Sequence, residues 1–223
     1  MDPRLLLVPS TLLGPTTWAS TARALEGLGH RVSVPSMQAV ADAAPPYWPA
    51  GVDSIRAAAA DDPVILVPHS NSGLYVPAVV DALGDQVRGV IFVDAALPDE
   101  GATTQRDLLN GLVDPDGRLP PWTSWWDEAD VAALFPDDEI RAQVEAEQKR
   151  MPLAYYDNLP PLLGSWDGPP RAYVWFGEPY GEYAGRAAAD GWTTRHIAGN
   201  HLHMLVDPAA VAAALLEIAE GWQ

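Results

Sequence analysis

Short apolar runs alternate with longer helix-like segments along the first half of the chain, and this alternation constrains the fold more than any other feature. Four apolar runs have the length of buried strands: residues 5–8, 31–34, 64–67 and 87–93. Three segments between them carry apolar residues or alanines at helical spacing: residues 18–28, 52–60 and 73–83. Strands that are apolar along their whole length are typical of a parallel sheet with helices on both faces. The sequence therefore predicts an α/β fold.

The alternation breaks after Pro98 and resumes near Arg171. The intervening residues 99–167 contain polar turns, a tryptophan cluster and an acidic helical segment at 137–150. Two more strands and two more helices are then predicted, at residues 171–176, 193–197, 183–190 and 208–218. This order predicts one domain over residues 1–223, into which residues 99–167 are inserted as a small helical lid. The proline-rich residues 42–49 are expected to form a loop.

Charge and composition exclude several classes of protein. Among 223 residues, 13 Lys and Arg are outnumbered by 30 Asp and Glu, which gives a formal net charge of −17. Such a chain repels the phosphates of nucleic acids and the surfaces of anionic membranes. It contains no cysteine, which excludes disulfides, thiolate metal sites and cysteine nucleophiles. No apolar run resembles a signal peptide or a membrane span. We therefore expect a cytoplasmic protein whose partner is a small molecule, and a homodimer is left open.

The strongest chemical signal is the turn Pro68-His69-Ser70-Asn71-Ser72-Gly73, which directly follows a predicted strand and precedes a predicted helix. A serine on such a sharp strand-to-helix turn presents its hydroxyl as a nucleophile. The turn usually has glycine two positions before and after the serine, whereas this chain has Pro68 and Ser72. A serine that only caps the following helix would give a similar pattern. Ser70 is therefore a candidate nucleophile or a helix cap.

His201 is the candidate base for such a nucleophile. It lies in the loop between the last predicted strand and the last predicted helix, where a histidine can meet a serine from another part of the chain. His203 lies two residues further on and is expected to bond locally or to line a pocket. Motifs such as H-E-x-x-H and G-x-G-x-x-G are absent from the sequence, so we expect no metal and no cofactor.

Several segments, taken in their order and spacing, resemble the α/β-hydrolase family over nearly the whole chain. They are residues 5–18, 29–32, 68–73, 90–98 and 199–208. Within the family, the chain looks like small, lid-bearing serine hydrolases of actinobacterial type. The resemblance implies an α/β-hydrolase fold, which has a mostly parallel central sheet, helices on both faces and a small helical lid. It also implies Ser70 as the nucleophile and His201 as the base of a catalytic triad.

The resemblance further implies an oxyanion hole made of two backbone N–H groups. One is the N–H of Asn71, which follows the nucleophile, and the other comes from the loop after the first strand. In that loop, Pro9-Ser10 replaces the usual His-Gly pair, which places the second donor at Thr11, with Leu12 as the near alternative. Because only the backbone donates, the altered side chains do not by themselves remove this function.

The acid of the triad has two candidates. Family members usually carry it after the strand that precedes the histidine strand, where this chain has Tyr180, with Glu178 nearby. The other location known in the family is the end of an earlier strand, where Asp94 stands. A carboxylate at the carboxyl edge of the sheet would fix the tautomer of the histidine. We favour Asp94 over Glu178 narrowly, and a dyad without an acid is also left open.

Aromatic residues of the lid are candidates for binding substrate. Trp122, Trp125, Trp126 and Tyr156 belong to the predicted insertion, and Leu12 is a further candidate in the loop after the first strand. Aromatic side chains in a pocket favour apolar or planar substrates. Some of them would instead hold the lid onto the core.

These observations predict a serine hydrolase that cleaves an ester, lactone, thioester or related acyl bond of a small apolar or aromatic substrate. Because a fold does not fix a reaction, two alternatives remain. One is a non-hydrolytic tailoring enzyme of natural-product biosynthesis, such as an epimerase, cyclase or lyase. The other is a protein that binds a ligand in the aromatic pocket without catalysis.

Overall fold

A single sheet organises the molecule. The computed structural model describes residues 2–98, 106–164 and 166–222. Its six strands lie in the order β2-β1-β3-β4-β5-β6, and every neighbouring pair is parallel. Their bounds are β1 Arg4–Val8, β2 Val32–Ser33, β3 Val64–Ser70, β4 Val87–Ala95, β5 Arg171–Trp175 and β6 Thr193–His196. The predicted α/β class with a parallel central sheet is confirmed.

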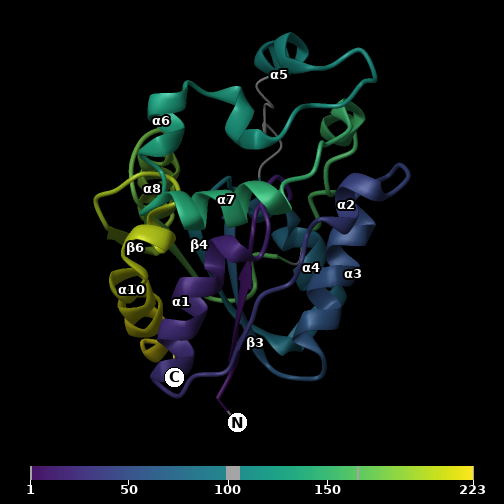
Figure 1. Cartoon of the computed structure of the whole chain (residues 1–223). Coiled ribbons are helices and arrows are strands. Elements are labelled where there is room, and N and C mark those ends of the chain that lie inside the picture. The colour runs from purple at the N-terminus through teal and green to yellow at the C-terminus, as the bar shows by residue number, and fades with distance from the viewer. Residues whose placement is uncertain (1, 99–105, 165, 223) are drawn as a thin grey trace.

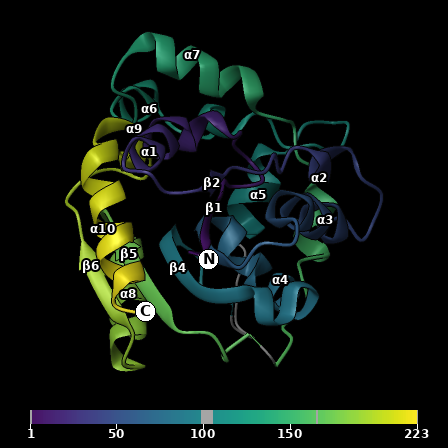
Figure 2. The same ribbon diagram turned by 90° about the horizontal axis from the view of Figure 1, so that it is seen from below.

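Helices cover both faces of this sheet (Figures 1 and 2). One face carries α1 Thr16–Gly27, α9 His203–Val206 and α10 Pro208–Glu220. The other carries α2 Ala39–Asp42, α3 Trp48–Ala59, α4 Val76–Leu83 and α8 Tyr180–Ala189. The predicted doubly covered sheet is confirmed.

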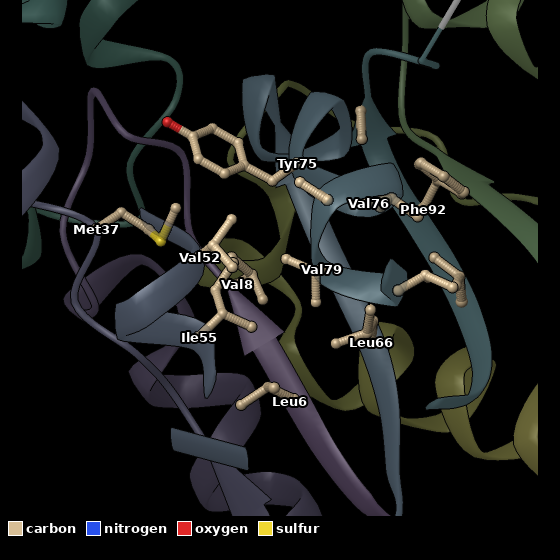
Figure 3. Packing of buried hydrophobic residues seen from close by; sticks show 14 of the residues in the cluster. Leu6, Val8, Met37, Val52, Ile55, Leu66, Tyr75, Val76, Val79 and Phe92 are labelled. Atoms are coloured by element: carbon tan, nitrogen blue, oxygen red, sulfur yellow. The ribbon is translucent and has the colours of Figure 1, made fainter. Parts of the chain in front are cut away.

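Alternation along the inner strands explains why both of their faces carry apolar side chains. In β1, Leu5 and Leu7 belong to the core beneath α1 and α10. Leu6 and Val8 point to the opposite core, where Figure 3 shows them with Ile55 of α3. Because successive strand side chains face opposite sides, both sets must be apolar when both faces are covered.

The described part of the predicted lid lies at the carboxyl ends of the strands. It contains α5 Arg106–Leu112, α6 Glu128–Ala132 and α7 Asp138–Glu147, with the 3₁₀ turns Trp122–Trp125 and Leu153–Asp157. Figure 1 places α5 and α6 at the end of the molecule opposite to both termini, with α7 below them in the view. Residues 99–105 and 165 of the predicted lid lie outside the described residues. The division into a core and a lid over 99–167 stays a prediction.

Several predicted boundaries were wrong. The predicted loop 42–49 is shorter, because α2 ends at Asp42 and α3 already begins at Trp48. Pro49 is accommodated at the start of α3, where a helix needs no N–H donor. The helix predicted at 183–190 begins at Tyr180, and α9 was not predicted. None of the described helices combines the length and apolarity needed to cross a membrane.

Candidate active site

Ser70 ends β3 in a strained backbone conformation. Its φ of 59° and ψ of −132° lie in a region that side-chain-bearing residues rarely adopt. The 3₁₀ turn Asn71–Tyr75 follows directly. A Cβ atom on Gly73 would lie 2.0 Å from the carbonyl oxygen of Ala96, so this position needs glycine. The turn therefore has the strand-to-helix geometry that the sequence predicted around Ser70.

Ser72 fits where a glycine is usual because its hydroxyl is bonded inside the turn. Its Oγ accepts a hydrogen bond from the N–H of His69 at 2.8 Å. The same oxygen lies 2.7 Å from the carbonyl oxygen of His69 and 3.0 Å from that of Val8. The buried hydroxyl thus has acceptors and a donor, and it ties the turn to β1.

Asp94 and His201 meet at the carboxyl edge of the sheet. The Nδ1–H of His201 donates to Oδ2 of Asp94 at 3.0 Å. The other carboxylate oxygen, Oδ1, accepts from the N–H of Phe176 at 2.7 Å, and Asp94 is only 1% exposed. Of the two predicted acids, the structure therefore pairs Asp94 with the histidine. Glu178 lines the pocket described below but has no hydrogen bond to His201 in the described structure.

Burial sets the protonation of this pair. It lowers the pKa of His201 and raises the pKa of Asp94, because burial disfavours the charged form of each group. His201 is therefore a neutral imidazole at neutral pH. With its Nδ1 proton held by Asp94, its Nε2 is the nitrogen that can accept a proton.

His69 supports His201 from below. It is fully buried, and its Nε2–H donates to the carbonyl oxygen of His201 at 3.0 Å. The two imidazole rings lie 4.5 Å apart between centroids. Burial lowers the pKa of His69 to about 3, so its ring stays neutral. This contact holds the loop that carries His201. His203 contacts Phe176 instead of the pocket.

Tyr180, at the start of α8, is a site residue whose contacts the sequence did not predict. Its ring stacks on His201, with centroids 4.8 Å apart and planes within 3°. Its hydroxyl lies 3.4 Å from Nε2 of His201, and a hydrogen bond with Ser70 opposes the effect of burial, which raises the pKa of Tyr180. Only its place after Glu178-Pro179, where an acid was expected, indicated that this position meets the histidine.

The predicted oxyanion residues Asn71 and Thr11 lie together, although the N–H of Thr11 is engaged. The N–H of Thr11 donates to Oδ1 of Asn71 at 3.0 Å, and Nδ2 of Asn71 donates to Oγ1 of Thr11 at 2.7 Å. The N–H of Leu12, the alternative donor, is bonded to Oγ of Ser10 at 3.2 Å. Both N–H groups that were candidates for the second oxyanion donor are thus bonded to side chains, those of Asn71 and Ser10.

A pocket of about 620 Å³ opens beside Ser70 and His201. The predicted residues Trp122, Trp125, Trp126 and Tyr156 all line it. Sequence reasoning missed several other lining side chains, because the segments that carry them (the turn after β3, the loop after β4, the lid and α8) meet only in the folded chain. They are Leu74, Leu97, Leu108, Leu109, Asp130, Leu134, Leu159, Tyr180, Glu182, Tyr183 and Arg186.

Leu12 is the one predicted substrate contact that does not line this pocket. It is 7% exposed and belongs to the core that contains Leu6 and Val8. Its side chain is therefore placed for packing, and the prediction of a substrate-binding role is corrected. Within the described residues, no group of three or more His, Asp or Glu side chains is arranged to hold a metal ion.

Comparisons with known proteins agree with this architecture. No protein-family model matches the chain. An alignment of 128 positions with a carbendazim-hydrolysing esterase from Nocardioides sp. (strain SG-4G) is 30% identical and covers 53% of this chain and about half (50%) of that esterase.

Two solved structures match the chain over almost its whole length. Tomato methylketone synthase I, in complex with 2-tridecanone, is 15% identical with a TM-score of 0.76, and all of both chains are covered. An extracellular α/β-hydrolase from a Paenibacillus species is 17% identical with a TM-score of 0.72, covering 97% of this chain and 99% of that one. The resemblance first noted in the sequence is thus confirmed at the level of the fold: this chain has the α/β-hydrolase fold.

Proposed function

We propose that the protein is a serine hydrolase that cleaves an ester, lactone, thioester or related acyl bond of a small apolar or aromatic substrate. One observation carries the proposal: strained Ser70 opens into the same pocket as His201, whose Nδ1–H is held 3.0 Å from Asp94. A nucleophile, a base and a group that orients the base are the parts that acyl transfer needs. The similarity to an esterase supports the same reaction class.

In the proposed reaction, Oγ of Ser70 attacks the substrate carbonyl while Nε2 of His201 takes the hydroxyl proton. Asp94 holds the imidazolium that forms. The carbonyl oxygen becomes an oxyanion, for which the N–H groups of Asn71 and Thr11 are the proposed donors. His201 returns the proton to the leaving group as the tetrahedral intermediate collapses to an acyl-Ser70. Water, deprotonated by His201, then attacks the acyl carbonyl, and the proton returns from His201 to Oγ of Ser70 as the acid is released.

For this reaction, Ser70 must become the partner of Nε2. In the resting protein that nitrogen faces the hydroxyl of Tyr180 at 3.4 Å, a distance at which a hydrogen bond is weak. The exchange of partners therefore costs little. The stacked ring of Tyr180 keeps the imidazole in plane throughout.

The pocket supports an apolar or planar substrate of small size. Its volume of about 620 Å³ lies within the range of small-molecule sites, and tryptophans of the lid contribute to its wall. Trp122 also contacts His201, with ring centroids 5.9 Å apart, so a planar group bound there would lie beside the reacting atoms. We propose that the reaction uses no cofactor and takes place in the cytoplasm.

A fluorophosphonate probe tests the proposal, because it forms a covalent bond only with an activated serine. The wild-type protein should be labelled on the peptide that contains Ser70, and Ser70→Ala should abolish both labelling and ester hydrolysis. Ser124→Ala, at an exposed position of the lid, is the matched control and should be labelled like the wild type. Ester hydrolysis that survives in Ser70→Ala would refute the mechanism.

A second candidate function keeps the fold without hydrolysis, as an epimerase, cyclase or lyase in natural-product biosynthesis. It is favoured by the engaged N–H groups of Thr11 and Leu12, since hydrolysis needs free oxyanion donors. The similarity to methylketone synthase I fits this candidate as well. For an epimerase or cyclase the product would have unchanged mass, and p-nitrophenyl esters would be poor substrates.

Ligand binding that survives Ser70→Ala and His201→Ala, without any turnover, would indicate a binding protein.

A further inference from the structure

The side chain of Asn71 accepts hydrogen bonds from the loop of residues 9–13, which we call the oxyanion loop. Oδ1 of Asn71 accepts from the N–H of Thr11 at 3.0 Å and from Oγ–H of Ser10 at 2.9 Å. Oγ of Ser10 in turn accepts from the N–H of Leu12 at 3.2 Å. Both backbone groups that could serve as the second oxyanion donor are thus tied, directly or through Ser10, to the same oxygen atom.

The other half of the amide strengthens this arrangement. Nδ2 of Asn71 donates to Oγ1 of Thr11 at 2.7 Å, so the side chain is held at both ends by one residue of the oxyanion loop. Thr11 and Ser10 are each only 1% exposed, whereas Asn71 is half-buried and lines the pocket. A substrate carbonyl that enters the pocket can therefore reach the amide before it reaches the N–H of Thr11.

The consequence is a competition for one proton. An N–H group has a single hydrogen, so the N–H of Thr11 cannot bond fully to both Oδ1 of Asn71 and an oxyanion. The developing oxyanion carries charge and is the stronger acceptor, so it displaces the neutral amide oxygen once the reaction is under way. Breaking the resting bond is a cost that the reaction must meet each time.

We propose that Asn71 is a positioning residue whose side-chain amide latches the oxyanion loop and withholds the N–H of Thr11 until substrate displaces it. The inference rests on the proposed serine-hydrolase function. The backbone N–H of Asn71 is the first oxyanion donor and is unaffected by any change of its side chain. The latch thus acts only on the second donor.

The rate of labelling of Ser70 by a fluorophosphonate measures the latch, since the phosphonyl oxygen occupies the oxyanion hole. Thr11→Val is the least disruptive probe, because valine matches threonine in shape and keeps the N–H but removes the Oγ1 that holds Nδ2 of Asn71. Asn71→Ala removes the amide altogether. Both variants should be labelled faster than the wild type, and Asn71→Ala about fivefold faster, the factor that corresponds to one neutral hydrogen bond.

Asn71→Asp gives the opposite sign. It keeps an oxygen that accepts from Thr11 and adds a negative charge where the oxyanion develops, so labelling should become slower than in the wild type. Asn158→Ala is the matched control, because within the described part of the chain that amide bonds only inside its own lid turn, to the carbonyl oxygen of Ala154 at 2.8 Å. Its labelling rate should equal that of the wild type.

An amide NMR spectrum separates a latch from a merely structural contact. In the wild type, the N–H resonance of Thr11 should move on phosphonylation, as its acceptor changes from Asn71 to the phosphonyl oxygen. A purely structural side chain would change only the melting temperature when replaced. If neither Thr11→Val nor Asn71→Ala is labelled faster than the wild type, the latch is refuted while the proposed function stands. If no variant and no wild-type protein is labelled at Ser70, the proposed function fails and the latch fails with it.

Discussion

At the scale of single residues, the site depends on which proton sits on which nitrogen. Asp94 accepts from Nδ1 of His201, and this bond leaves Nε2 as the acceptor that faces the pocket. The N–H of Phe176 holds the other carboxylate oxygen, so the carboxylate cannot turn away. His69 holds the backbone of His201 from the opposite side. Three separate contacts thus fix the orientation of one imidazole.

Asp94→Asn should lower kcat for ester hydrolysis by about 10⁴-fold, because the amide can present a donor to Nδ1 and stabilise the wrong tautomer of His201. The asparagine oxygen can still accept from Phe176, so the melting temperature should change little. Glu178→Gln is the matched control at the other predicted acid and should leave kcat nearly unchanged. Steady-state kinetics on p-nitrophenyl esters measure both variants. A large loss in Glu178→Gln together with an active Asp94→Asn would contradict the assignment of the acid.

Local sequence was sufficient for some residues of this site and insufficient for others. Ser70 was predictable because its conformation follows from a turn that is continuous in sequence, between an apolar strand and a helix. The contact of Tyr180 with His201 was not, because it depends on where α8 begins and how a helix docks on a distant loop. The direction of the Leu12 side chain was not predictable either. Leu12 packs in the core, and the sequence of a loop does not show whether a side chain in it points to the core or to the pocket.

At the scale of secondary-structure elements, the spacing of apolar residues predicted the strands of the sheet well and the ends of the helices poorly. The inner strands were predictable because short, largely apolar runs between turn residues are typical of strands buried on both faces. The start of α3 was missed because prolines at 45, 46 and 49 suggest a loop, although proline is well suited to a first helical turn. The attachment of the lid could not be predicted at all, because it depends on contacts between residues far apart in sequence.

One of these contacts is made by Glu147, the last residue of α7. Its carboxylate accepts from the N–H of Thr16 at 2.9 Å and from Oγ1 of Thr16 at 2.8 Å, at the first residue of α1. It therefore satisfies a free N–H at the amino end of a helix, where a negative charge is also favourable. A Cβ on Gly14 would lie 2.0 Å from Oε2 of Glu147, which shows how closely the carboxylate packs on the loop before α1.

Glu147→Ala should lower the free energy of unfolding by about 1–2 kcal/mol, the usual cost of losing a helix cap. For a chain of this size, each kcal/mol corresponds to about 2–4 °C in melting temperature. Glu139→Ala, at an exposed position of the same helix, is the matched control and should change stability by less than about 0.5 kcal/mol. Calorimetry on both variants measures the difference. Equal melting temperatures would mean that α7 is held by its other contacts alone.

At the scale of the whole molecule, the dominant property is an excess of negative charge. With 13 Lys and Arg against 30 Asp and Glu, at least 17 carboxylates have no basic residue to neutralise them one for one. The described ion pairs join partly exposed side chains, such as Arg150 with Asp114 at 2.6 Å and Arg31 with Asp62 at 2.7 Å. Pairs of this kind at a surface each contribute little to stability. Repulsion among the unneutralised carboxylates should therefore outweigh them, and it destabilises the compact state.

Moderate salt distinguishes between these two effects. Screening weakens ion pairs and repulsion alike, so the larger of the two decides whether salt raises or lowers the melting temperature. We expect the melting temperature at pH 7 to rise as NaCl increases from about 10 mM to about 150 mM, over which the screening length shortens from about 30 Å to about 8 Å. A gain of 1 kcal/mol would appear as about 2–4 °C. The rise should shrink at pH 5.5, nearer the sequence pI of about 4.4, where protonation has removed part of the negative charge. A fall in melting temperature with salt at pH 7 would show instead that the ion pairs outweigh the net charge.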